Sequence, residues 1–128
     1  MRQFRMKKTD HAEWLLLLDD MLVNGMGAER SVYQEPIPGT FVPRMFQYRI
    51  QTQYGPLILK PETPWKLSAS DRLRYDCTVF ARFENDLPIT HKYGHKWNHH
   101  YGPRERSELN NGVTDLAVRI ARILPTQS

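Results

Sequence analysis

Residues 44–60 read RMFQYRIQTQYGPLILK, and this stretch decides the fold. From Phe46 to Tyr54, aromatic and β-branched residues alternate with arginine and glutamine, which is the period-two pattern of a strand with one buried face. A glycine-proline pair at 55–56 then turns the chain, and the Leu-Ile-Leu run at 57–59 is typical of a short returning strand. The stretch therefore predicts an antiparallel hairpin.

A further strand is predicted at 74–83. Its inward positions are apolar or aromatic, namely Tyr75, Cys77, Val79, Ala81 and Phe83. The alternate positions are polar except for Phe80, which breaks the pattern on the face expected to meet water. An antiparallel sheet with one buried and one solvated face shows this alternation. A turn follows at 85–88, where asparagine, aspartate and proline are concentrated.

Helices are expected at both ends of the chain. The first begins near Asp10, whose carboxylate can accept the free amide hydrogens of a first turn, and ends at Gly25 or Gly27. Leucines and Trp14 fill one wide face of this helix. The last helix spans 107–124, and its apolar stripe is Leu109, Val113, Leu116, Ala117, Ile120, Ile123 and Leu124. A later start at Thr114 is the alternative.

These elements predict one α+β domain over residues 1–128. We expect an antiparallel sheet of three to four strands, with an N-terminal and a C-terminal helix packed on one face. Residues 1–8 are interpreted as a basic N-terminal arm. Residues 28–43 contain three prolines and are interpreted as a connecting loop without regular structure.

Composition narrows the class of protein. The 40% hydrophobic and 25% charged fractions are ordinary for a globular domain. The longest apolar run, 14–18, is far short of a membrane span, so no membrane partner is expected. Cys77 is the single cysteine, which excludes an internal disulfide and favours a cytoplasmic location. No motif implies a cofactor.

Charge is distributed unevenly along the chain, whose net charge is +4. Residues 1–8 carry four basic and no acidic side chains, residues 9–90 carry 8 basic and 11 acidic ones, and residues 91–128 carry 6 and 3. Two positive ends are compatible with an acidic partner such as nucleic acid.

The most distinctive stretch is GHKWNHHYGPRER, residues 94–106. If it is extended, alternate positions align flat rings on one side, and flat rings can stack on bases while neighbouring cations meet phosphates. The sequence therefore predicts a nucleic-acid-binding segment. The residues expected to carry it are Lys92, Tyr93, Lys96, Trp97, Tyr101, Arg104 and Arg106. Burial of Trp97 and Tyr101 in the core is the alternative interpretation.

A metal site in the same segment is less favoured. Its candidate ligands are His95, His99 and His100, but two residues four apart on a strand lie about 13 Å apart, too far to share an ion. Only a folded segment would gather them. No metal is therefore expected.

Two other function classes remain open. One is a protein-binding inhibitor or adaptor, whose docking surface would be composed of Phe80, the leucines at 16–17 and the proline-rich arm. A homodimer through the leucine-rich first helix is a further alternative. The other is a hydrolase in which His99 or His100 acts as base with an acidic orienting residue, either Glu108 or Asp115. No nucleophile elbow, Walker loop or His-Glu-x-x-His motif is present, so a non-enzymatic accessory protein is preferred.

Overall fold

The computed structural model describes residues 7–39, 43–66, 73–75, 78–84, 97–100 and 109–125, and for 65–66, 73–74, 97–100 and 109–111 it describes the backbone alone. The elements in chain order are α1 (Lys8–Asp19), the π-helix η1 (Asp20–Gly25), β1 (Glu29–Gln34), β2 (Met45–Thr52), β3 (Gly55–Pro61), β4 (Trp65–Lys66), β5 (Leu73–Arg74), β6 (Thr78–Phe83), β7 (Trp97–His100) and α2 (Leu109–Ala121).

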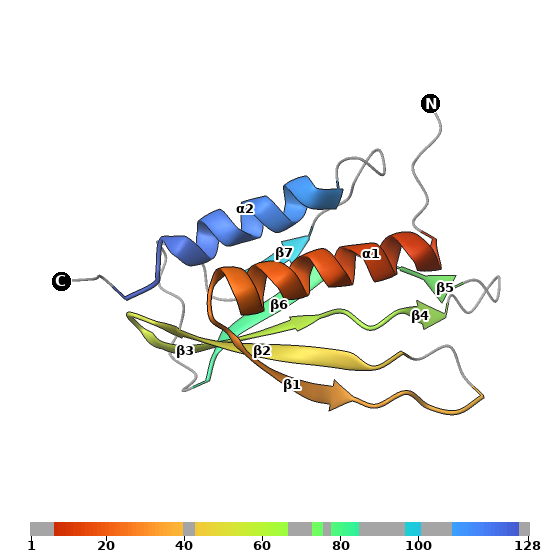
Figure 1. Ribbon diagram of the computed structural model, residues 1–128. Helices are drawn as coiled ribbons and strands as arrows, with labels where there is room; N and C mark the ends of the chain where they lie inside the picture. The colour runs from red at the N-terminus through yellow and green to blue at the C-terminus, as the bar shows by residue number, and fades with distance from the viewer. Residues whose placement is uncertain are drawn as a thin grey trace.

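Five of these strands form one antiparallel sheet in the order β1-β2-β3-β6-β7 (Figure 1). The predicted hairpin is its centre, because β2 pairs with β3 from Tyr48 opposite Leu59 to Thr52 opposite Gly55. Gly55 has a φ of 106°, which suits glycine at this tight turn. β4 and β5 form a separate two-stranded sheet.

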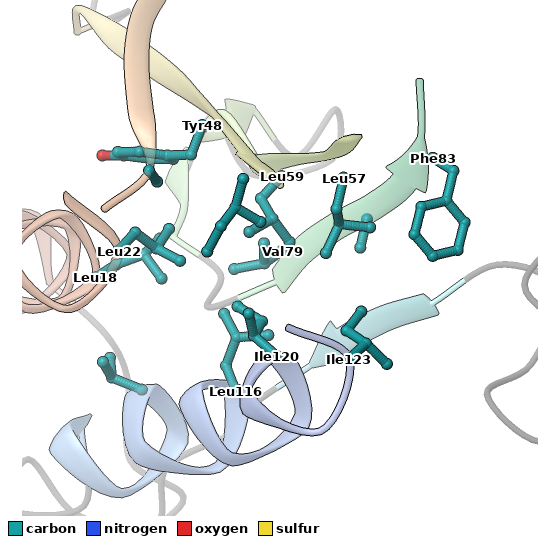
Figure 2. Close-up of a cluster of buried hydrophobic side chains, with 14 of the residues drawn as sticks. Leu18, Leu22, Tyr48, Leu57, Leu59, Val79, Phe83, Leu116, Ile120 and Ile123 are labelled. Carbon is teal, nitrogen blue, oxygen red and sulfur yellow. The ribbon is translucent and has the colours of Figure 1, made fainter. Parts of the chain in front are cut away.

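The core lies between the sheet and the two helices (Figure 2). In β2 from Tyr48 and in β6 from Val79, alternate residues are buried, as the period-two pattern predicts. In β3, the three consecutive residues 57–59 are buried. The buried sheet residues of the cluster are Tyr48, Ile50, Leu57, Leu59, Val79, Ala81 and Phe83. The helices contribute Trp14, Leu18, Leu22, Val113, Leu116, Ile120 and Ile123. Figure 1 shows α1 and α2 on the same side of the sheet.

The first helix begins two residues earlier than the sequence predicts. It starts at Lys8, and the Asp10 carboxylate accepts a hydrogen bond from the Lys7 backbone N–H at 3.0 Å. Asp10 therefore caps the helix from within its first turn instead of from the position before it. The helix then widens into η1 before Gly27, whose φ of 71° ends it in the left-handed region as expected.

Residues 29–34 correct the prediction that 28–43 has no regular structure. They form β1, which pairs with β2 from Glu29 opposite Arg49 to Gln34 opposite Met45. The prolines that disfavour a strand begin only at residue 36. Most of β1 is exposed, so its sequence lacks the apolar alternation by which a half-buried strand is recognised.

The α+β prediction is confirmed, with an antiparallel sheet and a helix towards each end of the chain. The main sheet has five strands, one more than the three to four expected, because β1 was not predicted. The last helix spans Leu109–Ala121, so Gly112 lies inside it as the longer alternative predicted. In the described part of the chain, no helix is both long and apolar enough to span a membrane.

Candidate functional site

Both helices lie on one side of the sheet (Figure 1). The residues of β2, β3 and β6 on the other face include arginine, lysine and one phenylalanine. No described helix covers this face. We call the residues Gln47, Arg49, Ile58, Lys60, Phe80 and Arg82 the open face. They alternate along β2, β3 and β6 with the buried core residues, and residues opposite one another in antiparallel strands share a face.

Phe80 is the aromatic residue of the open face and lies on β6. Its side chain is 43% exposed, although it lies on β6, which has a strand on each side in the described sheet. Lys60 on β3 is its direct partner across the ladder, and Arg82 follows two residues along on the same face of β6. The sequence prediction that Phe80 lies on the polar face is confirmed.

Lys60 and Arg82 are the two cationic residues next to Phe80 on the open face. Among the described residues, no carboxylate forms an ion pair with either side chain. The Lys60 ammonium lies 5.6 Å from the centre of the Tyr33 ring, which is a cation–π contact that leaves its positive charge intact. Phe80 is thus flanked by two cations, one across the ladder and one along the strand.

Arg49, by contrast, is neutralised by its neighbours. Its Nε donates to Glu84 at 2.6 Å, and Glu29 lies 4.0 Å from its Nη1. The hydrogen bond from Arg49 to Glu84 raises the pKa of the guanidinium above its ordinary value. Ile58 lies between Arg49 and Arg82 in the register and is only 7% exposed, so the open face has an apolar floor at this row.

Tyr33 borders the open face beside Lys60. Its hydroxyl donates to the Pro61 carbonyl at 2.7 Å and shares a hydrogen bond of 2.9 Å with Thr63. Burial raises the pKa of Tyr33, and the nearby carboxylate of Glu62 adds to this effect. The phenol therefore stays neutral and anchors β1 to the end of β3.

The segment 94–106, which the sequence predicts to bind nucleic acid, contains β7, the strand that pairs with β6 beside Phe80. β7 pairs with β6, with Asn98 opposite Phe80, Trp97 opposite the buried Ala81, and His99 opposite the buried Val79. The expectation of an extended backbone is confirmed for residues 97–100. The other residues of the predicted nucleic-acid site, Lys92, Tyr93, Lys96, Tyr101, Arg104 and Arg106, lie outside the described residues.

Most of the candidate residues of the metal and hydrolase hypotheses have no described side chain. His95 and Glu108 lie outside the described residues, and β7 is described as backbone only, so the imidazoles of His99 and His100 are not placed. Within the described ranges, no group of three histidine, cysteine, aspartate or glutamate side chains is arranged to hold a metal ion. Asp115 is exposed on α2.

The surfaces considered for docking a protein do not form one patch. Leu16 is 72% exposed on α1, in the helix layer, whereas Phe80 lies on the opposite side of the sheet. In the proline-rich arm, Ile37 is 46% exposed. A single partner surface therefore does not use Leu16 and Phe80 together.

One polar cluster, which is built around Asp19, was missed by the sequence analysis. The Asp19 carboxylate accepts a hydrogen bond of 2.7 Å from the Tyr48 hydroxyl and forms an ion pair of 3.0 Å with Arg30. Arg30 in turn lies 4.7 Å from the centre of the Phe46 ring. The signal was the hydroxyl of Tyr48 on a strand face predicted to be buried, since a buried phenol needs a polar partner. This cluster joins α1 to β1 and β2.

Comparison with models of known protein families, with curated protein sequences and with solved structures found no significant match. The function is therefore inferred from the chemistry of the open face and of the segment beside it.

Proposed function

We propose that this chain is a small non-enzymatic accessory protein that binds nucleic acid on its open face. The observation that carries the proposal is the exposed ring of Phe80 between the charges of Lys60 and Arg82, which no described carboxylate pairs. An aromatic ring offers a base a stacking surface, and cations beside it attract phosphates. The sequence carries no nucleophile elbow, Walker loop or His-Glu-x-x-His motif, so we prefer binding to catalysis.

The segment 91–106 supports the same proposal. It is rich in lysine, arginine and aromatic residues, and part of it forms β7, the neighbour of the strand that carries Phe80. A ligand lying over Phe80 would therefore run alongside this segment. Lys92, Tyr93, Lys96, Tyr101, Arg104 and Arg106 stay candidate contacts from the sequence. Trp97 is also a candidate from the sequence, but its register partner on β6 is the buried Ala81 and not Phe80. The single cysteine is compatible with a cytoplasmic location, which is part of the proposal.

The proposal is tested by fluorescence anisotropy with labelled nucleic acid and the full chain. We expect binding to mixed-sequence RNA or DNA at about 50 mM salt, and a steep loss of affinity as the salt concentration rises to about 200 mM, because phosphate contacts release counterions. Absence of binding at the lower salt concentration, or an affinity that does not change with salt, contradicts the proposal.

A partner protein is the second candidate, and the observation that favours it is Leu16, which is 72% exposed. Large apolar side chains on a helix surface are frequent at protein interfaces. Light scattering of the wild type and of Leu16→Gln tests the homodimer form of this hypothesis. A dimeric mass that becomes monomeric in the variant supports it, and a monomeric wild type across the concentration range excludes it.

A further inference from the structure

The shape of the open face restricts which form of nucleic acid can reach Phe80. Strands lie about 4.8 Å apart, so a five-stranded sheet is roughly 19 Å wide, whereas the major groove of B-DNA is about 12 Å wide. Phe80 lies on β6, inside the described sheet and not on an edge strand. The groove of undeformed B-DNA is therefore narrower than the sheet, so a duplex would have to be bent or opened before Phe80 could meet a base.

An unpaired base has no such restriction. In a single strand the flat face of a base can be turned out and laid on an aromatic side chain, and stacking of this kind tolerates any base. The exposed Phe80 ring is accessible from the solvent side of the sheet. A sheet surface with an exposed aromatic residue is thus suited to single strands.

The charges around Phe80 fit the backbone of such a strand. Lys60 and Arg82 are diagonal neighbours across the β3–β6 ladder, which places their β-carbons about 7–8 Å apart. Of the described carboxylates near this face, Glu29 and Glu84 are paired with Arg49, and Glu62 lies near Tyr33 beside Lys60. Among the described residues, the cations next to Phe80 form no ion pair, while Arg49 at the other end of the face does.

We propose that the open face binds single-stranded nucleic acid, with an unpaired base stacked on Phe80 and its flanking phosphates at Lys60 and Arg82. The inference rests on the proposed function and adds to it the ligand form and the stacking residue. Arg49 is not part of this site, because its charge is already compensated.

The test compares a short labelled single strand with its duplex, as RNA and as DNA, using the full chain. We expect the wild type to bind the single strand at least about tenfold more tightly than the duplex. Phe80→Ala should weaken single-strand binding by about tenfold, in line with the loss of one stacked base, and leave duplex binding unchanged. If the protein prefers RNA or DNA, this preference shows which sugar the ligand contains, and either result supports the site.

Four further variants accompany this measurement. Val118→Ala removes an apolar side chain of similar exposure, 47%, from α2 on the other side of the molecule and should leave binding unchanged. Phe80→Leu keeps an apolar side chain but removes the flat ring, so it should weaken binding almost as much as alanine. Arg82→Gln should weaken binding more than Arg119→Gln, which removes one exposed arginine from α2. Thermal unfolding checks that each variant is folded.

The outcomes separate the two proposals. If the protein binds nucleic acid with strong salt dependence but holds duplex as tightly as single strand, or is indifferent to Phe80→Ala, the stacking site is wrong and the proposed function stands. The stacking site is also wrong if Phe80→Leu binds like the wild type. If neither form binds at low salt, the proposed function itself fails.

Discussion

Tyr48 shows how one buried hydroxyl ties a helix to the sheet. Its side chain is buried, and its hydroxyl donates to the Asp19 carboxylate at 2.7 Å. Hydrogen bonds to charged groups contribute about 1.5–3 kcal/mol. We expect Tyr48→Phe to lower the free energy of unfolding by about 2 kcal/mol, measured by urea denaturation at neutral pH. An unchanged urea midpoint would show that the hydrogen bond contributes nothing to stability.

The pKa of Tyr48 also determines how stability responds to alkaline pH. Burial, together with the Asp19 carboxylate, raises the pKa of Tyr48 well above its ordinary value of 10.0. Above about pH 10 the unfolded chain releases this proton and the folded chain keeps it, so ionisation stabilises the unfolded state as the pH rises. We expect the wild type to lose stability between about pH 10 and pH 11 more steeply than Tyr48→Phe, by up to about 1.4 kcal/mol per pH unit. Equal slopes would contradict this role.

Two glycines near the end of the first helix form a matched pair. Gly27 has a φ of 71°, and no atom lies within 4 Å of the point that a β-carbon would occupy, so conformation alone opposes a side chain there. Gly27→Ala should lower the free energy of unfolding by about 1 kcal/mol. Gly25→Ala should not lower it, because Gly25 lacks a left-handed φ and its nearest neighbour would be the Asp20 carbonyl oxygen at 4.0 Å. Thermal unfolding of both variants checks the difference.

At the scale of elements, α2 carries both buried and exposed apolar residues. Ile120 is fully buried against the sheet, whereas Val118 is 47% exposed two residues earlier. Ile120→Ala should lower the free energy of unfolding by about 2–5 kcal/mol through lost burial and the cavity left behind. Val118→Ala should change it by less than about 0.5 kcal/mol. Similar losses for the two variants in urea denaturation would mean that α2 packs differently.

Periodicity explains which elements the sequence predicted. The hairpin of β2 and β3 and the stripe of α2 have one buried face each, and burial imposes a repeat of about two or 3.6 residues on the sequence. β1 is mostly exposed, so no repeat marked it. The π-helix η1 differs from an α-helix in its hydrogen bonds and not in its composition, which leaves no sequence signal.

The candidate site was predictable in part for a related reason. Phe80 was identifiable because it violates the alternation of its own strand. Lys60 was not, because its position beside Phe80 arises from the register between β3 and β6, and a register is a property of two strands together. The expected extended backbone of 97–100 was found, while the predicted contacts on either side of it stay predictions.

At the scale of the whole molecule, the salt dependence of binding should report where uncompensated charge lies. For single strands, each phosphate neutralised contributes about 0.7 to the slope of log affinity against log salt concentration. We expect Lys60→Gln and Arg82→Gln each to reduce the slope by about this amount. Arg49→Gln should change it less, because Glu84 and Glu29 already compensate its charge. Anisotropy titrations over a series of salt concentrations measure the slopes, and equal effects of all three variants would contradict a localised site.

The irregularity in β1 also affects how copies of this chain meet. β1 is an edge strand of the described sheet, and its register shifts between Val32 and Gln34. Such a bulge twists the margin of a sheet, and the charges of Glu29 and Arg30 would have to lose water before another strand could dock along it. An incoming chain would find an even ladder of amides and carbonyls over only part of this strand. The open face is therefore uncovered by any described helix, while the β1 edge disfavours edge-to-edge pairing with other copies and the growth of fibrils.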